Sequence, residues 1–232
     1  MAQKRQSLIK REFDGLKDMA MDLVPRLIGS MSAWQSPEQF FASMGSVAAG
    51  FAAGRAKKLL EELRDDEENI DEKELSSEKA SQSFIELMKF AAQENPDVET
   101  WEAVKKIFKH SLRKDVTEQE RLSLYDMLDI CKQLNGSEIR ILAGAYQILN
   151  APEEVNKNQR QSDWWAGKVA ENIGFAAKEQ VLRFEDNLIR LQLIAPREIL
   201  NGSTLDTWRG GGGTSEHRLT PLGRGLAKLL SE

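Results

Sequence analysis

The chain of 232 residues is poor in the residues that build disulfides, zinc sites and histidine catalysis. Its single cysteine, Cys131, excludes an intramolecular disulfide and a cysteine-based zinc site, and it favours the reducing cytoplasm. Cys131 falls at an apolar position of a helical pattern, so we expect a buried, inert thiol. The two histidines, His110 and His217, lie in different predicted segments and offer little material for histidine catalysis or a metal site. Six prolines and sixteen glycines exclude a collagen-like or proline-rich chain.

Long hydrophobic runs and familiar catalytic motifs are also missing. The longest uncharged stretch, 39–54, is shorter than the roughly 20 apolar residues of a membrane span, and the first residues show no signal-peptide pattern. The chain contains no Walker A string, GxGxxG, GxSxG, HExxH or CxxC. The glycine run 210–213 lacks the Lys-Ser/Thr pair and the helix start of a phosphate loop. We therefore expect a protein that is not an enzyme and that holds neither a cofactor nor a metal ion.

The negative charge of the chain is concentrated in one run. Residues 61–74 carry nine acidic and two basic side chains, a net charge of −7 within a total of −5. Such a run is typical of a linker or of a solvated helix end, and both alternatives stay open. The remainder shows no strong basic field of the kind that marks many nucleic-acid-binding proteins.

Apolar residues recur at spacings of three and four along most of the chain, which predicts helices nearly throughout. Capping residues mark several helix starts. Asp97 is placed to cap one helix, and Thr117 with Glu120 has the spacing of a capping box. Ser137 is expected to cap the next helix.

Asn135-Gly136 interrupts the helical pattern and marks a boundary. We predict a helical region over residues 1–135 and a second domain over residues 136–232. In the first region, Gly50 and Gly54 have a spacing typical of helices that approach closely. We expect these glycines at an interface and the helical region to mediate self-association into a homo-oligomer.

The second domain shows the order helix, helix, turn, helix, strand, glycine-rich loop, strand, helix. A short helix over residues 163–173 ends at Gly174, and a second begins near Ala177. The short join between them has the length of a helix-turn-helix corner. The second helix is expected to bury one apolar stripe, formed by Val181, Phe184, Leu188 and Leu191.

Residues 137–232 resemble the winged-helix domain of MarR-like bacterial regulators. The positions of the recognition helix and the wing exit that carry this resemblance are Val181, Phe184, Leu188, Leu193, Ile194, Leu219, Thr220 and Gly223. The chain departs from the family at Gln192, where those regulators have a glycine before the Leu-Ile pair. The resemblance implies a mainly α-helical protein in which a small β-hairpin wing follows the recognition helix.

The resemblance also implies DNA contacts from the recognition helix and the wing. The corresponding residues are Lys178, Gln180, Arg183, Arg209 and Arg218. Acidic residues oppose this interpretation, because a carboxylate repels phosphate: Glu179, Glu185 and Asp186 share the predicted helix. Residues 160–230 carry ten basic and eight acidic side chains, only a small positive excess. Engagement of DNA and engagement of a protein partner both stay open.

The adjacent Trp164 and Trp165 point about 100° apart on a helix, so we expect one in the core and the other at an interface. The whole layout is similar to that of the helical abortive-infection alpha-type phage-defence proteins. This second resemblance implies a cytoplasmic bacterial protein that responds to phage, and it transfers no functional residue.

Three functions compete on these observations. The first is a non-enzymatic bacterial binding or regulatory protein whose winged-helix domain engages DNA or a protein. The second is a phage-defence effector or a membrane-active helical protein that acts through residues 37–56. The third is a structural subunit of a larger complex.

Overall fold

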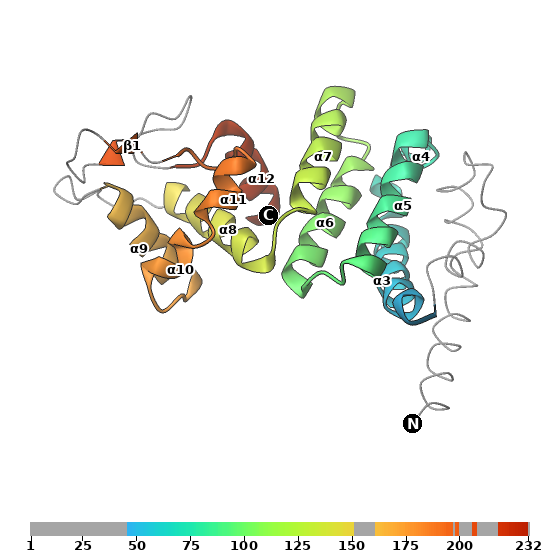
Figure 1. Cartoon of the computed structure of the whole chain (residues 1–232). Coiled ribbons are helices and arrows are strands. Elements are labelled where there is room, and N and C mark those ends of the chain that lie inside the picture. The colour runs from blue at the N-terminus through green and yellow to red at the C-terminus, as the bar shows by residue number, and fades with distance from the viewer. Residues whose placement is uncertain (1–45, 151–160, 197, 200–205, 208–217, 232) are drawn as a thin grey trace. The chain divides into compact units, whose positions relative to one another are not determined.

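The computed structural model is mainly α-helical, which confirms the predicted class (Figure 1). The residues that it describes are 46–150, 161–196, 198–199, 206–207 and 218–231. The chain divides into two compact units, Met1–Lys132 and Gln133–Glu232.

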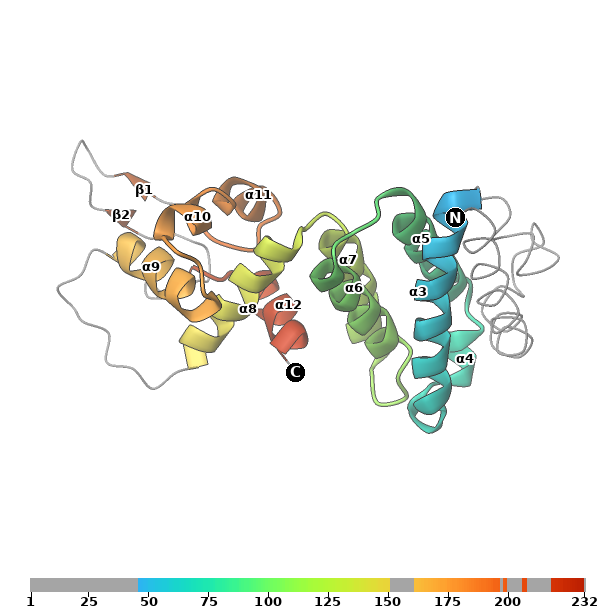
Figure 2. The same cartoon turned by 90° about the horizontal axis from the view of Figure 1, so that it is seen from below.

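The described part of the N-terminal unit is a set of packed helices. Its elements are α3 (Ser46–Asp65), the 3₁₀ helix η1 (Glu67–Asn69), α4 (Glu72–Leu75), α5 (Glu78–Gln93), α6 (Val98–Ser111) and α7 (Glu118–Cys131). Helix α3 lies beside α5, and α6 lies beside α7, in both views (Figures 1 and 2). Phe84 of α5 and Phe108 of α6 meet in the core, with ring centroids 6.2 Å apart.

The acidic run 61–74 is both a helix end and a folded connection. Helix α3 continues through Asp65, and η1 and α4 occupy most of the remainder. Backbone contacts hold this stretch against the α6–α7 loop, since the Asp71 N–H donates to Leu112 O (2.8 Å) and the Lys114 N–H donates to Asn69 O (2.9 Å). The Asp71 side chain caps α4.

Two capping predictions in this unit are confirmed. Asp97 Oδ1 accepts from the Thr100 N–H at 2.7 Å and begins α6. Thr117 Oγ1 accepts from the Glu120 N–H (3.3 Å), and Glu120 Oε2 accepts from the Thr117 N–H (3.0 Å), which completes the capping box of α7. These pairs satisfy backbone N–H groups that a helix start leaves open.

The C-terminal unit packs α8 against both α9 and α12, and α9 against α10 (Figures 1 and 2). Its elements are α8 (Gly136–Asn150), α9 (Gln161–Ile173), α10 (Lys178–Leu182), α11 (Glu185–Arg190), β1 (Glu198–Ile199), β2 (Asp206–Thr207) and α12 (Pro221–Ser231). Helix α9 ends as predicted at Gly174, whose φ of 73° suits glycine. The buried side chains include Trp165, Val169, Leu188 and Leu226.

The cap of α8 differs from the prediction. Asn135, and not Ser137, caps this helix: Asn135 Oδ1 accepts from the Glu138 N–H (3.1 Å), and Glu138 Oε2 accepts from the Asn135 N–H (2.9 Å). Asparagine caps as well as serine does, and the glutamate three residues later completes a reciprocal pair. The helix therefore begins at Gly136.

The predicted continuous helix after Ala177 is wrong, because the structure has two short helices there. The Phe184 N–H donates to Val181 O (3.1 Å), a three-residue spacing that tightens the chain between α10 and α11. Val181 and Leu188 are buried as predicted, whereas Phe184 and Leu191 are only half-buried.

The strand content of the described residues is small. Strands β1 and β2 pair antiparallel over two residues each, and Ile194 forms an isolated bridge with Leu219. These contacts do not amount to a wing. Residues 208–217 lie outside the described part of the chain, so the wing stays a prediction.

Candidate functional site

The exposed surface of α10 holds two of the predicted DNA-contact residues. Lys178 begins α10 and is half-buried, and Arg183 follows the helix and is exposed. Gln180 is also exposed, but its Oε1 accepts from the Ala176 N–H at 2.7 Å and from the Ala177 N–H. Its amide therefore helps to begin the helix. Lys178 and Arg183 are the two basic residues of α10 and its C-terminal cap.

Arg218 requires a correction, because it is 2% exposed and its guanidinium is directed into the unit. Its Nε and Nη2 donate to Ala195 O at 3.1 and 2.8 Å. Its Nη1 pairs with Glu185, and its guanidinium carbon lies 5.0 Å from the centroid of the Trp165 ring. The planar guanidinium suits such a buried site, since it donates in several directions and stacks on aromatic rings. Arg218 is therefore not a surface contact for phosphate.

The remaining predicted site residues divide between the core and the undescribed segments. Trp165 is 1% exposed and belongs to the core. The side chain of Trp164, the surroundings of Gly50 and the whole of Arg209 lie outside the described residues. Gly54 is half-buried on α3.

The Leu-Thr-x2-Gly motif at residues 219–223 has a structural role at each position. Leu219 is fully buried. Thr220 Oγ1 donates to Gln192 O (2.6 Å) and accepts from the Gly223 N–H (3.0 Å), so it begins α12 and ties it to the end of α11. A Cβ on Gly223 would lie 1.9 Å from Leu193 O, so only glycine allows this approach.

Gln192, the departure from the MarR-like pattern, adopts the backbone conformation that favours glycine. Its φ is 57°. The Gln192 N–H donates to Ile189 O and the Leu193 N–H donates to Leu188 O, both at 2.9 Å. This is the Schellman arrangement that ends a helix with one left-handed residue. The glutamine thus adopts, at a conformational cost, a backbone conformation that glycine adopts freely.

Backbone hydrogen bonds join the segment that follows α11 to the segment that precedes α12. The Ala195 N–H donates to Arg218 O (2.7 Å), and the Thr220 N–H donates to Leu193 O (3.1 Å). The chain that leaves α11 therefore lies antiparallel to the chain that begins α12. Residues 193–195 and 218–220 are called the paired segments below.

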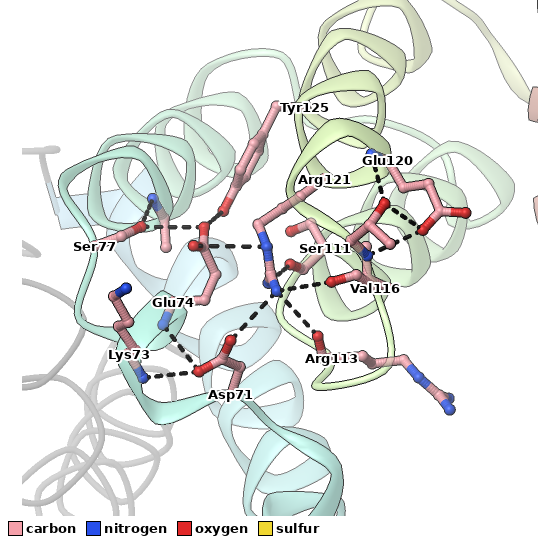
Figure 3. Close-up of polar contacts among 12 residues, drawn as sticks. Asp71, Lys73, Glu74, Ser77, Ser111, Arg113, Val116, Glu120, Arg121 and Tyr125 are labelled. Atoms are coloured by element: carbon pink, nitrogen blue, oxygen red, sulfur yellow. Dashed lines mark hydrogen bonds and ion pairs between the residues drawn. The ribbon is translucent and has the colours of Figure 1, made fainter.

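A second polar cluster, around Arg121 in the N-terminal unit, was missed by sequence reasoning (Figure 3). Arg121 is 8% exposed, and its guanidinium donates to the backbone oxygens of Ser111, Arg113 and Val116. Nη2 also lies 3.4 Å from Asp71 Oδ2. These contacts close the α6–α7 loop over the end of α6, where helical carbonyls lack internal partners.

Glu74 and Tyr125 complete this cluster (Figure 3). The Tyr125 hydroxyl donates to Glu74 Oε1 at 2.6 Å, Ser77 Oγ donates to the same oxygen at 3.1 Å, and Arg121 Nε lies 3.7 Å from Glu74 Oε2. Burial and the neighbouring Glu74 carboxylate raise the pKa of Tyr125 well above its ordinary value. The polar groups satisfy one another, so we interpret the cluster as a structural junction.

The single thiol is buried, as predicted. Cys131 has no exposed surface, and burial raises the pKa of its thiol to about 12. It is thus a thiol, and not a reactive thiolate, at neutral pH.

The described residues present neither a metal cluster nor a membrane span. In this part of the chain, no three histidine, cysteine, aspartate or glutamate side chains gather in a way that would hold a metal ion. None of the helices described is long and apolar enough to cross a bilayer. Comparison of the chain with protein-family models, with curated proteins and with solved structures gives no match.

Proposed function

We propose that the protein is a non-enzymatic binding or regulatory protein of the bacterial cytoplasm whose C-terminal unit engages DNA. The observation that carries the proposal is the antiparallel contact of the paired segments behind α9, α10 and α11. This arrangement holds together the two ends of residues 196–217, as the base of a wing would. A helix-turn-helix followed by a wing is one of the recurrent ways to enter the grooves of DNA.

The internal ion pair changes the charge argument against DNA. Glu185 is 6% exposed and pairs with Arg218, so it is not a surface carboxylate that repels phosphate. The basic residues at the surface of α10 and α11 include Lys178, Arg183 and Arg190. The exposed acids of these two helices are Glu179 and Asp186. A weakly positive surface supports modest, salt-sensitive binding.

The decisive experiment is a fluorescence-anisotropy titration of the full chain with random-sequence duplex DNA at low and moderate salt. We expect micromolar or tighter binding at low salt that falls steeply as salt is raised. The double variant Lys178→Ala/Arg183→Ala should bind more weakly, and its salt dependence should decrease by about 0.9 in log–log slope for each phosphate that is no longer neutralised.

Lys228→Ala provides the matched control. Lys228 is an exposed base of α12 in the same unit, so its removal changes the net charge equally without touching α10. Equal losses of affinity in Lys228→Ala and in each single α10 variant would indicate a general charge effect only. Absence of binding at low salt would overturn the DNA proposal and favour a protein partner, to be sought by pulldown from the host.

We also propose that the helical region mediates self-association. Light scattering of the full chain over a range of concentrations tests this directly. A monomer mass at every concentration would contradict it.

A further inference from the structure

One buried guanidinium connects three parts of the C-terminal unit. Arg218 contacts Trp165 of α9, Glu185 at the first position of α11 and the carbonyl of Ala195 in the paired segments. Arg218 and Glu185 are 2% and 6% exposed. Neither side chain is therefore placed to touch a partner that approaches from solvent.

The pair of Glu185 and Arg218 fixes the orientation of the segments that it joins more than it stabilises the fold. Burying two charges costs desolvation free energy that their attraction roughly offsets, and apolar replacements of both partners are often neutral or stabilising. The hydrogen bonds from Nε and Nη2 to Ala195 O, in contrast, require defined angles, and they fix the direction in which Nη1 meets the Glu185 carboxylate. An apolar pair at these positions would fill the space without setting the orientation of α11 against Ala195.

We propose that Glu185 and Arg218 form a positioning pair that orients α11, and with it α10, against the paired segments. The pair thereby sets how Lys178 and Arg183 are presented to DNA, although neither of its members contacts DNA. This inference rests on the proposed function of the same unit. It also reverses the roles that the sequence suggested, in which Arg218 binds phosphate and Glu185 repels it.

The surface role and the positioning role of Glu185 predict opposite effects of one substitution on the affinity for DNA. If Glu185 were a surface carboxylate, Glu185→Gln would tighten DNA binding by removing a repulsion. As a member of the positioning pair, Glu185→Gln should instead weaken binding by roughly fivefold or more, the lower end of the range for coupled sites. Arg218→Met should weaken binding by a similar factor.

The salt dependence separates positioning from direct contact. If Arg218 touched phosphate, Arg218→Met would lower the log–log salt slope by about 0.9. A positioning role changes the slope alike in Glu185→Gln and Arg218→Met, because both variants displace the same contacts of Lys178 and Arg183. The double variant Glu185→Met/Arg218→Met should bind about as weakly as either single variant, because both changes break one interaction.

Folding is controlled with the same variants. Titrations are carried out at a temperature where circular dichroism shows native helix content, and the double variant, which leaves no unpaired buried charge, serves where a single variant unfolds. Tighter or unchanged binding by Glu185→Gln, or a lowered salt slope confined to Arg218→Met, would overturn the proposal.

Hydrogen exchange distinguishes failure of this inference from failure of the proposed function. If the wild-type chain does not bind DNA, the DNA proposal fails, and exchange at the Ala195 and Thr220 amides tests the pair alone. These amides donate across the paired segments. Faster exchange there in Glu185→Gln and Arg218→Met, and not in Lys228→Ala, would support the orienting role of the pair. Unchanged exchange would overturn it.

Discussion

Both units contain a buried arginine with internal partners, but the two arginines differ in where those partners lie. Arg121 donates to carbonyls between Ser111 and Val116, at most ten residues away in sequence. Arg218 reaches Ala195, 23 residues away, and Glu185 beyond it. Arg121 also pairs with Asp71, 50 residues away, so it closes the α6–α7 loop and holds it beside α4, whereas Arg218 joins α9, α11 and the paired segments.

This difference affects what each arginine can do. The junction around Arg121 stabilises one corner of the helical unit, and removing it should reduce stability. The junction around Arg218 also sets the relative placement of α11 and the paired segments. Removing it should change geometry even where replacement side chains preserve stability.

The largest expected effect is on the junction around Arg121. Arg121→Met should lower the free energy of unfolding by roughly 3–5 kcal/mol, because it leaves the half-buried Asp71 and Glu74 carboxylates and three carbonyl groups without their donor. Urea denaturation followed by circular dichroism measures the loss. Arg113→Met is the control, since Arg113 pairs at the surface with the exposed Asp115 and should change stability little. Equal losses in the two variants would erase the distinction between buried and surface arginines.

The next effect concerns the long-range closure of the C-terminal unit. Gly223→Ala should destabilise the protein by about 1–3 kcal/mol, because the new methyl group would overlap Leu193 O. Gly167→Ala, in α9, is the matched control: no heavy atom lies within 4 Å of its Cβ position, so alanine should raise stability by up to about 1 kcal/mol. Thermal denaturation of both variants should therefore show shifts of opposite sign. Shifts of the same sign would contradict the close approach.

A smaller expected effect is a pH dependence of stability in the N-terminal unit. In the N-terminal unit, Glu62 lies between Lys105 (2.6 Å) and Lys109 (3.1 Å). Burial opposes ionisation of Glu62, but these two ammonium groups outweigh it and hold the pKa of the carboxyl below its ordinary value. The stabilisation that ionised Glu62 gives to the folded protein is therefore complete above the unfolded pKa of 4.5, and it is lost as the pH falls through the lower folded pKa.

Glu62→Gln tests this pH dependence. Between pH 5 and pH 3, about the range around that unfolded pKa, the wild-type protein should lose more stability than the variant. The expected difference is smaller than the loss in Gly223→Ala. Urea midpoints measured across this range check it, and parallel pH profiles would contradict it.

The smallest expected effect is a gain. Gln192→Gly should stabilise the protein by up to about 1 kcal/mol, because glycine adopts a φ of 57° without the steric cost that a side chain carries. Asn95→Gly, at a φ of 43°, should gain less, since asparagine tolerates this region better than glutamine. The melting temperatures of the two variants measure the difference. A loss of stability in Gln192→Gly would show that the glutamine side chain contributes in another way.

Features that depend on neighbouring residues could be predicted from the sequence. The caps at Asp97 and Thr117 and the stop at Gly174 require partners only three to five residues away, so their pattern is visible along the chain. The cap of α8 was misplaced by two residues for a related reason. Asn135 and Ser137 are both suitable caps there, and the cap is Asn135 because its backbone N–H donates to the Glu138 carboxylate.

The candidate site was less predictable. The exposure of Arg183 follows from a helical surface, but the interior position of Arg218 does not follow from any local pattern. An arginine before an apolar strand is expected at the surface until its partners are known. The break between α10 and α11 was missed as well, because the apolar stripe continues across it.

By itself, the sequence determined the helical class and the helix ends at Asp97, Thr117 and Gly174, because these depend on short-range hydrogen bonds and on the period of the helix. Only the tertiary structure decided which charges face solvent and which face one another. An ion pair is a property of two positions in space. The distance in sequence between residues 185 and 218 does not indicate that the two side chains come into contact in the folded chain.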